Sequence, residues 1–190
     1  MTIQNMRISL LALAVLGAGC SSGSETSTDT TLGELVVDCT IEEENLTNHK
    51  NVTNCDFSGM DLSGMDLLGA EASGANFSGA NLTDASLSNS DFSGANFTDA
   101  DLTGARLSSA VLTGANFSGA NLSYAFLDRA GIYDTNFTGA DLSFAKLHEA
   151  TISGANFTNA ILVSAECTDA SILSSVVFTG ADLTITDCKP

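Results

Sequence analysis

The chain has 190 residues, among them 23 Asp or Glu and 6 Lys or Arg, and its formal net charge is −17 at pH 7. A nucleic-acid-binding protein needs a basic surface that neutralises phosphates, so this excess of acidic residues argues against DNA or RNA as a ligand. Strong acidity instead favours solubility, or the attraction of cations and basic partners.

Residues 1–19 have the features of a signal peptide. Arg7 precedes an apolar run at 8–16, and small residues at 17–19 lie directly before Cys20. This order is typical of an export signal, and the apolar run is too short to span a bilayer as a mature helix. The segment resembles a bacterial lipoprotein signal, in which Cys20 becomes the lipidated first residue. Because Gly17 stands where such signals usually carry Leu, ordinary secretion with cleavage nearby stays the alternative.

The lipoprotein-like signal implies an address. It places the protein outside the cytoplasm, at the bacterial cell envelope, with the lipid on Cys20 as a membrane anchor. Ser21 follows Cys20, and the absence of Asp at this place in such signals implies the outer membrane or a periplasm-facing anchor, with the leaflet left open.

Two further segments precede the regular part of the chain. Residues 20–31 are Ser, Thr, Gly, Glu and Asp apart from Cys20, which predicts a flexible tether. Residues 32–54 lack the regular pattern that follows. We expect them to form an N-terminal cap, because the first coil of a solenoid must cover its apolar side chains and its unpaired backbone edge.

From residue 55 onward the chain repeats a five-residue unit with a large apolar residue at its centre, as in 114–123. The centres fall into four columns, because each kind of centre returns at every fourth unit. The first column consists of Phe57, Phe77, Phe97, Phe117, Phe137, Phe157 and Phe178. The second and third columns are mostly Leu, and the fourth is mixed. Repetition at a fixed period means that the chain stacks each unit against its copies, with four units in one turn.

A four-sided coil fits this spacing. Apolar residues every five positions would not form a stripe on a 3.6-residue helix, and a flat strand would need uninterrupted alternation. Ala115 lies two residues before Phe117, so on an extended segment both side chains point into the lumen, and the residues on either side of Phe117 point to water. Gly119 then suits the corner, where the chain must turn.

The unit Ala-(Asn/Asp)-(Leu/Phe)-(Ser/Thr)-Gly resembles the pentapeptide repeat family. This resemblance implies an all-β fold, a right-handed quadrilateral β-helix, over residues 55–183, with 184–190 as the C-terminal end. Coils about 4.8 Å high then number about six to seven. The segment 173–177 carries one extra residue before Phe178, which predicts a local bulge that shifts the phase without ending the coil.

Four cysteines remain besides Cys20, namely Cys39, Cys55, Cys167 and Cys188. An even number in an exported protein predicts disulfides, and three pairings are open. Cys55 and Cys167 are more than five coils apart, roughly 27 Å, whereas a disulfide requires Cα atoms within about 7 Å. The coil arithmetic therefore favours Cys39 with Cys55 and Cys167 with Cys188. The alternative for the second pair is two buried thiols.

The outward positions near the third column differ from the rest of the surface. Most outward positions carry Asn, Asp, Ser, Thr or Gly, whereas bulky and basic residues gather here. The candidate contact patch consists of Arg106, Tyr124, Phe126, Arg129, Tyr133, Phe144, Lys146 and His148. Exposed aromatic side chains mixed with Arg are typical of contact sites. Neutral drift on a tolerant face is the alternative.

The sequence contains no recognisable catalytic set. No His, Asp and nucleophile converge, and only His49 and His148 could join the distant cysteine pairs at a zinc site. We therefore expect no enzymatic activity, no cofactor and no metal.

The expected function is that of a non-enzymatic envelope lipoprotein that presents a rigid rod to a protein or an envelope polymer. Two rods could also associate end to end through an exposed end coil. The family resemblance implies an alternative, because some pentapeptide repeat proteins resemble duplex DNA in shape and charge and bind type II topoisomerases. The export signal argues against that alternative, since topoisomerases act in the cytoplasm.

Overall fold

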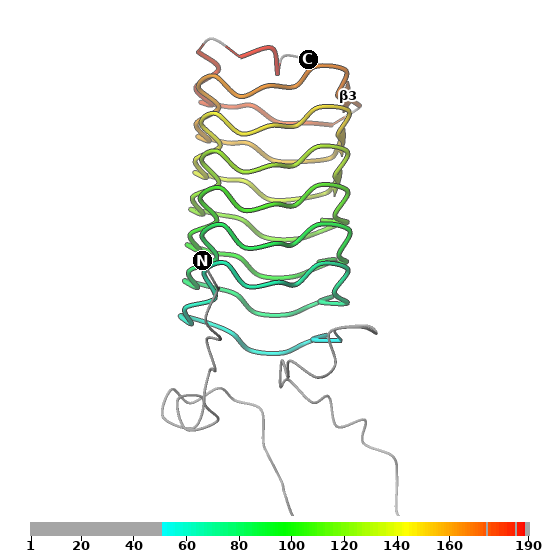
Figure 1. Ribbon diagram of the computed structural model, residues 1–190. Helices are drawn as coiled ribbons and strands as arrows, with labels where there is room; N and C mark the ends of the chain where they lie inside the picture. The colour runs from blue at the N-terminus through cyan, green and yellow to red at the C-terminus, as the bar shows by residue number, and fades with distance from the viewer. Residues whose placement is uncertain (1–50, 174, 185, 189–190) are drawn as a thin grey trace, which may run out of the picture.

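The computed structural model describes residues 51–173, 175–184 and 186–188, and these form a column of stacked coils (Figure 1). The predicted signal peptide, the tether, Cys20, Cys39 and all of the predicted cap before residue 51 lie outside the described residues. Within the described part of the chain, no helix has the length and apolarity needed to cross a membrane.

One coil consists of four five-residue units, because outward residues pair in parallel with the residue four units later, as Asn76 does with Asn96. Three short strands, β1 at Gly131–Tyr133, β2 at Thr151–Ser153 and β3 at Ser171–Ile172, form a parallel sheet in the order β1-β2-β3. Elsewhere in the described ranges the pairing consists of isolated bridges. The extended sides are this short because most of each five-residue unit is used for a turn.

Every fifth residue turns a corner with a left-handed backbone. In the unit around Phe77, the amide of Ala80 donates to the carbonyl of Phe77 at 3.0 Å, and Gly79 between them has a φ of +63°. This hydrogen bond and the positive φ are those of a type II β-turn. Glycine adopts positive φ without a steric penalty, and Asn and Asp tolerate it, which explains a corner such as Asp84 at +57°.

The predicted columns fill the lumen. The Phe and Leu centres and the small residues beside them are buried through most of the rod. The Phe rings of the first column stack from coil to coil, with centroids 4.6 to 5.1 Å apart. Burial of such a side chain contributes about 1.5–3 kcal/mol. The lumen is therefore a continuous apolar core, as the spacing predicted.

The predicted interruption lies in the last part of the rod. Asn156 pairs with Val177, one position later than the regular period of the other coils. Phe178 nevertheless stacks on Phe157 with ring centroids 5.1 Å apart. The extra residue therefore shifts the phase and the coil continues.

The coil pattern extends past both predicted ends of the repeat domain. Val52 is buried and its amide donates to the carbonyl of Glu71 at 2.7 Å, so residues 51–54, which the sequence assigned to the cap, already belong to a coil. At the other end, Cys188 is buried and forms a disulfide with Cys167, with Cα atoms 4.9 Å apart. Cys55 is also disulfide-bonded, and its predicted partner lies outside the described residues.

Phe117 tests the packing of the lumen. It is fully buried, and the ring centroids of Phe97 and Phe137 lie 4.6 and 5.1 Å away. Phe117→Ala leaves a cavity that the stacked coils cannot close, so we expect the free energy of unfolding to fall by about 3–5 kcal/mol. Phe144→Ala removes the same atoms from an exposed ring and should lower it by less than about 1.5 kcal/mol. Chemical denaturation measures both values, and equal losses would contradict this picture of the core.

Candidate interaction surface

The outward side chains of the first side of the rod bond to one another. Nδ2 of Asn96 donates to Oδ1 of Asn76 at 3.1 Å. Oδ1 of Asn96 accepts hydrogen bonds from the amide and the hydroxyl of Thr98, at 3.1 and 2.7 Å. Because this ladder uses its own donors and acceptors, the first side has a structural role.

The third side differs from the first in its outward residues. We define side three as the outward face that lies, in every coil, between the corner column of Tyr124 and the corner column of Arg129. Along its middle, Arg106, Phe126 and Lys146 are bridged in successive coils. Nζ of Lys146 lies 5.5 Å from the centroid of the Phe126 ring, which is a cation–π distance. Every Lys or Arg among the described residues lies on side three.

A groove runs along one edge of side three. Tyr124 and Phe144 stand at its corner with ring centroids 4.9 Å apart and planes within 4°. Their exposed fractions are 56% and 45%, so the rings face solvent. Gly104 lies next to Tyr124 in the same corner column, and a Cβ on it would lie 2.6 Å from Oδ1 of Asp84. The groove has a volume of about 650 Å³ and is lined by Asp84, Ser86, Gly104, Arg106, Tyr124, Phe126, Phe144 and Lys146.

The opposite edge of side three carries one ion pair and one contact between His and Glu side chains. Arg129 donates to both carboxylate oxygens of Glu149, at 2.8 and 3.2 Å. These hydrogen bonds lower the pKa of Glu149 and raise the pKa of Arg129. Nε2 of His148 lies 2.9 Å from a carboxylate oxygen of Glu166.

Two cations of side three have no carboxylate partner among the residues that the structure describes. They are Arg106 and Lys146, and the ion pairs of this part of the chain involve neither. They flank Phe126 in the preceding and the following coil. An anionic group of a ligand could therefore meet either cation without displacing a described carboxylate.

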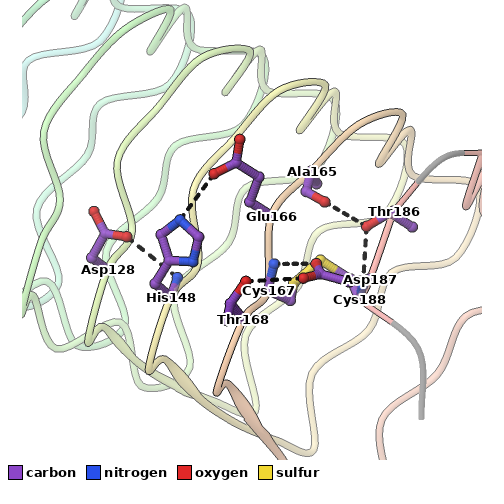
Figure 2. A network of polar contacts seen from close by, with 9 residues as sticks. All are labelled: Asp128, His148, Ala165, Glu166, Cys167, Thr168, Thr186, Asp187 and Cys188. Atoms are coloured by element: carbon purple, nitrogen blue, oxygen red, sulfur yellow. Dashed lines mark hydrogen bonds and ion pairs between the residues drawn. A yellow bond between two sulfur atoms is a disulfide. The ribbon is translucent and has the colours of Figure 1, made fainter.

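Side three continues to the disulfide in the last coil (Figure 2). The carboxylate of Asp187 accepts hydrogen bonds from the amide of Cys167 and from the hydroxyl of Thr168, the latter at 3.1 Å. Cys167, Asp187 and Cys188 cluster closely, but the two sulfur atoms are bonded to each other. A thiolate is the form of cysteine that binds zinc, so this cluster is not a thiolate metal site in its oxidised form.

Four corner residues of side three have an unusual backbone. They are Tyr124, Arg129, Phe144 and Glu149, with φ between +57° and +60°. All other non-glycine residues with positive φ in the described ranges are Asn, Asp or Ser. The four occupy both corners of side three in two successive coils.

The backbone strain at these four corners favours the hypothesis that side three has a binding role. A left-handed backbone destabilises a residue such as Tyr124 or Phe144 by about 1–2 kcal/mol. Residues held in this region cluster at binding sites, where the surrounding structure enforces them. Gly, Asn or Asp would relieve the strain at each of these corners.

The structure places seven of the eight predicted patch residues on side three. Five of them line the groove, namely Arg106, Tyr124, Phe126, Phe144 and Lys146. Arg129 and His148 lie toward the other edge, where Arg129 is paired with Glu149 and His148 contacts Glu166. Tyr133 lies in β1 on the adjoining side, where its ring packs over Gly131.

Sequence reasoning missed the other three residues of the groove. Asp84, Ser86 and Gly104 are ordinary residues of the repeat and carry no signal of their own. Their place in the same columns as Tyr124 and Phe126 could have identified them, because residues of one column lie above one another along the rod.

The strained corners give a direct test. Replacing both Tyr124 and Phe144 by Asn relieves about 1–2 kcal/mol at each position and removes a ring pair that contributes about 0.5–1.5 kcal/mol. We therefore expect the free energy of unfolding of the double variant to be equal to that of the wild type or higher. Tyr124→Phe keeps both the ring and the strain and serves as the control. A loss above about 1.5 kcal/mol in calorimetry would contradict the strain assignment.

The fold is shared with known structures. A trypsin-treated variant of QnrB1, a plasmid-mediated fluoroquinolone resistance protein, is 23% identical with a TM-score of 0.52, over 72% of this chain and 78% of that chain. HetL, involved in heterocyst differentiation regulation in the cyanobacterium Nostoc, is 22% identical with a TM-score of 0.30, over 74% of this chain and 88% of that chain. A pentapeptide repeat protein of the Arabidopsis thaliana thylakoid lumen is 26% identical with a TM-score of 0.28, over 78% of this chain and 71% of that chain.

A family model gives the stronger result. No curated protein sequence matches the chain. The model described as pentapeptide repeats, however, matches in 8 copies, over residues 51–89, 75–114, 90–129, 110–143, 125–163 and 140–172. These matches span most of the described rod, and the chain belongs to the pentapeptide repeat family.

Proposed function

We propose that this chain is a non-enzymatic binding rod and that side three is its contact surface. The observation that carries the proposal is the cluster of Tyr124, Arg129, Phe144 and Glu149 at left-handed corners, in two adjacent coils. Exposed aromatic rings and two cations without a described carboxylate partner lie between and beside these corners. Aromatic and Arg side chains contribute most of the affinity at protein interfaces, so this composition supports binding.

The proposal includes an address and a shape. The chain is exported, and lipid on Cys20 holds it at the bacterial envelope, in the outer membrane or facing the periplasm. The signal-like residues 1–19 and the small residues before Cys20 support this anchor. The rod is right-handed with about six to seven coils, and it presents side three to a protein or an envelope polymer.

The dense packing of the lumen supports a non-enzymatic role. The lumen is filled by Phe and Leu side chains, so the groove on side three lies on the outside of the rod and is open to solvent. Its ionisable residues are Asp84, Tyr124 and two cations, and its lining residues include no nucleophile with a neighbouring base. This set favours adhesion over bond-making chemistry.

The family supports a second candidate function. The net charge of −17 and the likeness in fold to QnrB1 favour a DNA-mimic protein that binds a topoisomerase. The signal-like N-terminus argues against it, because an exported chain would not meet such a target in the cytoplasm.

Lipid labelling and fractionation separate these two functions. Cells that express the wild-type chain should incorporate labelled palmitate into it and hold it in the membrane fraction. Cys20→Ser removes the acceptor thiol, so its labelling should disappear. Unchanged labelling of Cys20→Ser would rule out this anchor, and wild-type chain in the cytosol would favour the DNA-mimic function.

Side three can be tested after cross-linking in intact envelopes has identified the partner. Replacing Tyr124, Phe126 and Phe144 by Ser should lower recovery of that partner at least about tenfold, because exposed aromatic anchors carry much of the affinity. The matched control replaces three exposed apolar residues outside side three by Ser: Val111, Ile161 and Val177. Recovery that stays at the wild-type level in the first variant, or falls equally in both, would end the proposal for side three.

A further inference from the structure

We propose that side three binds side three of a second copy of this chain, with the two rods antiparallel. The inference rests on the proposed role of side three as a contact surface and names one partner for it. Its basis is the order of residues along this side, which is self-complementary when two copies are read in opposite directions.

The parallel ladders define the geometry. Arg106, Phe126, Lys146 and Glu166 are bridged in successive coils and form one line along the rod. A two-fold axis that lies in the interface and crosses the rod at right angles reverses the order of the coils. It leaves the place of each residue across the side unchanged, so each line meets its own copy. We place this axis between the coil of Phe126 and the coil of Lys146.

With the axis at this place, the middle line is complementary in both pairs of coils that meet, the inner pair next to the axis and the outer pair beyond it. Phe126 faces the partner's Lys146, which repeats between rods the cation–π contact that these residues make within one rod at 5.5 Å. Arg106, which forms no ion pair with a described residue, faces the partner's Glu166. The two-fold symmetry makes each of these contacts twice.

The two corner lines match in the same register. Tyr124 faces the partner's Phe144, so the exposed ring stacks of the two rods form one aromatic cluster. Arg129 faces the partner's Glu149, so the ion pair within each rod extends to a four-residue network across the axis. All four strained corner residues lie in the two coils next to the axis, at the centre of the interface, where side chains contribute most to affinity.

A parallel arrangement lacks this match. In the antiparallel pair, Asp128 faces the partner's His148, an acid opposite a base. A two-fold axis along the rods would instead set each middle-line residue against its own copy, so that Arg106 would face the partner's Arg106 and Lys146 the partner's Lys146, and it would set Phe144 against the partner's Glu149. Like charges that face each other, and a ring that faces a carboxylate, disfavour that pairing, so the residue order selects the antiparallel one.

The size of side three predicts a weak dimer. A side about three residues wide measures roughly 10 Å, and six coils extend about 29 Å. The face enclosed by these two lengths has an area well below the roughly 800 Å² that each partner buries in a standard stable interface. The two rods should therefore associate only at high local concentration, which the proposed membrane anchor would supply.

Exchange of one charge pair tests both the surface and the orientation. The full chain carries Cys20→Ser, so that lipid does not bring copies together. Arg129→Glu and Glu149→Arg each place like charges across the axis, and each should weaken dimerisation more than about tenfold. An equimolar mixture restores opposite charges at both corner contacts of a mixed dimer, and it should associate as the wild type does. Sedimentation velocity over a concentration series measures all four samples.

Controls separate this inference from the proposed function. Glu71→Arg changes the same charge outside side three and should leave dimerisation unchanged, and circular dichroism checks that each variant is folded. A wild-type chain that stays monomeric up to about 1 mM, or a mixture that stays monomeric where the wild type pairs, overturns the dimer. If the triple Ser variant still loses its envelope partner in that case, only self-pairing is wrong and side three remains a contact surface.

Discussion

The left-handed corner is the constraint on which this structure depends. A positive φ at every fifth residue closes a type II turn and redirects the chain, and four such turns return it to its starting point one coil higher. This closure places each side chain over its counterpart in the preceding coil. The Phe stack and the Leu columns are consequences of that register, and their burial stabilises it in return.

Because every corner requires a positive φ, a corner residue that does not suit this backbone indicates a selection other than for stability. A corner tolerates Gly without steric cost and Asn or Asp at little cost, and almost every corner of the described rod uses one of these or Ser. Tyr124 and Phe144 stand at corners where their own backbone is strained and where their rings are exposed. Stability alone does not select such residues. The proposed contact would use the rings, and side three combines them with the cations Arg106 and Lys146.

The sequence predicts the core of this rod well and its surface less well. The Phe column, the phase shift before Phe178 and the proximity of Cys167 to Cys188 all follow from counting, because each depends only on the period of four units. The groove cannot be predicted in this way, because it depends on the direction of long side chains such as Arg106. The period fixes which residues are neighbours, and rotamers decide what lies between them.

A crystal structure of the chain at a resolution that defines backbone dihedrals would test the central claim most directly. The account predicts positive φ at Tyr124, Arg129, Phe144 and Glu149, with the ring of Tyr124 stacked on that of Phe144 and the coil register unbroken on both sides. Negative φ at these corners, with the chain detouring from the regular register to accommodate them, would contradict both the closure of the coil and the strain assigned to side three.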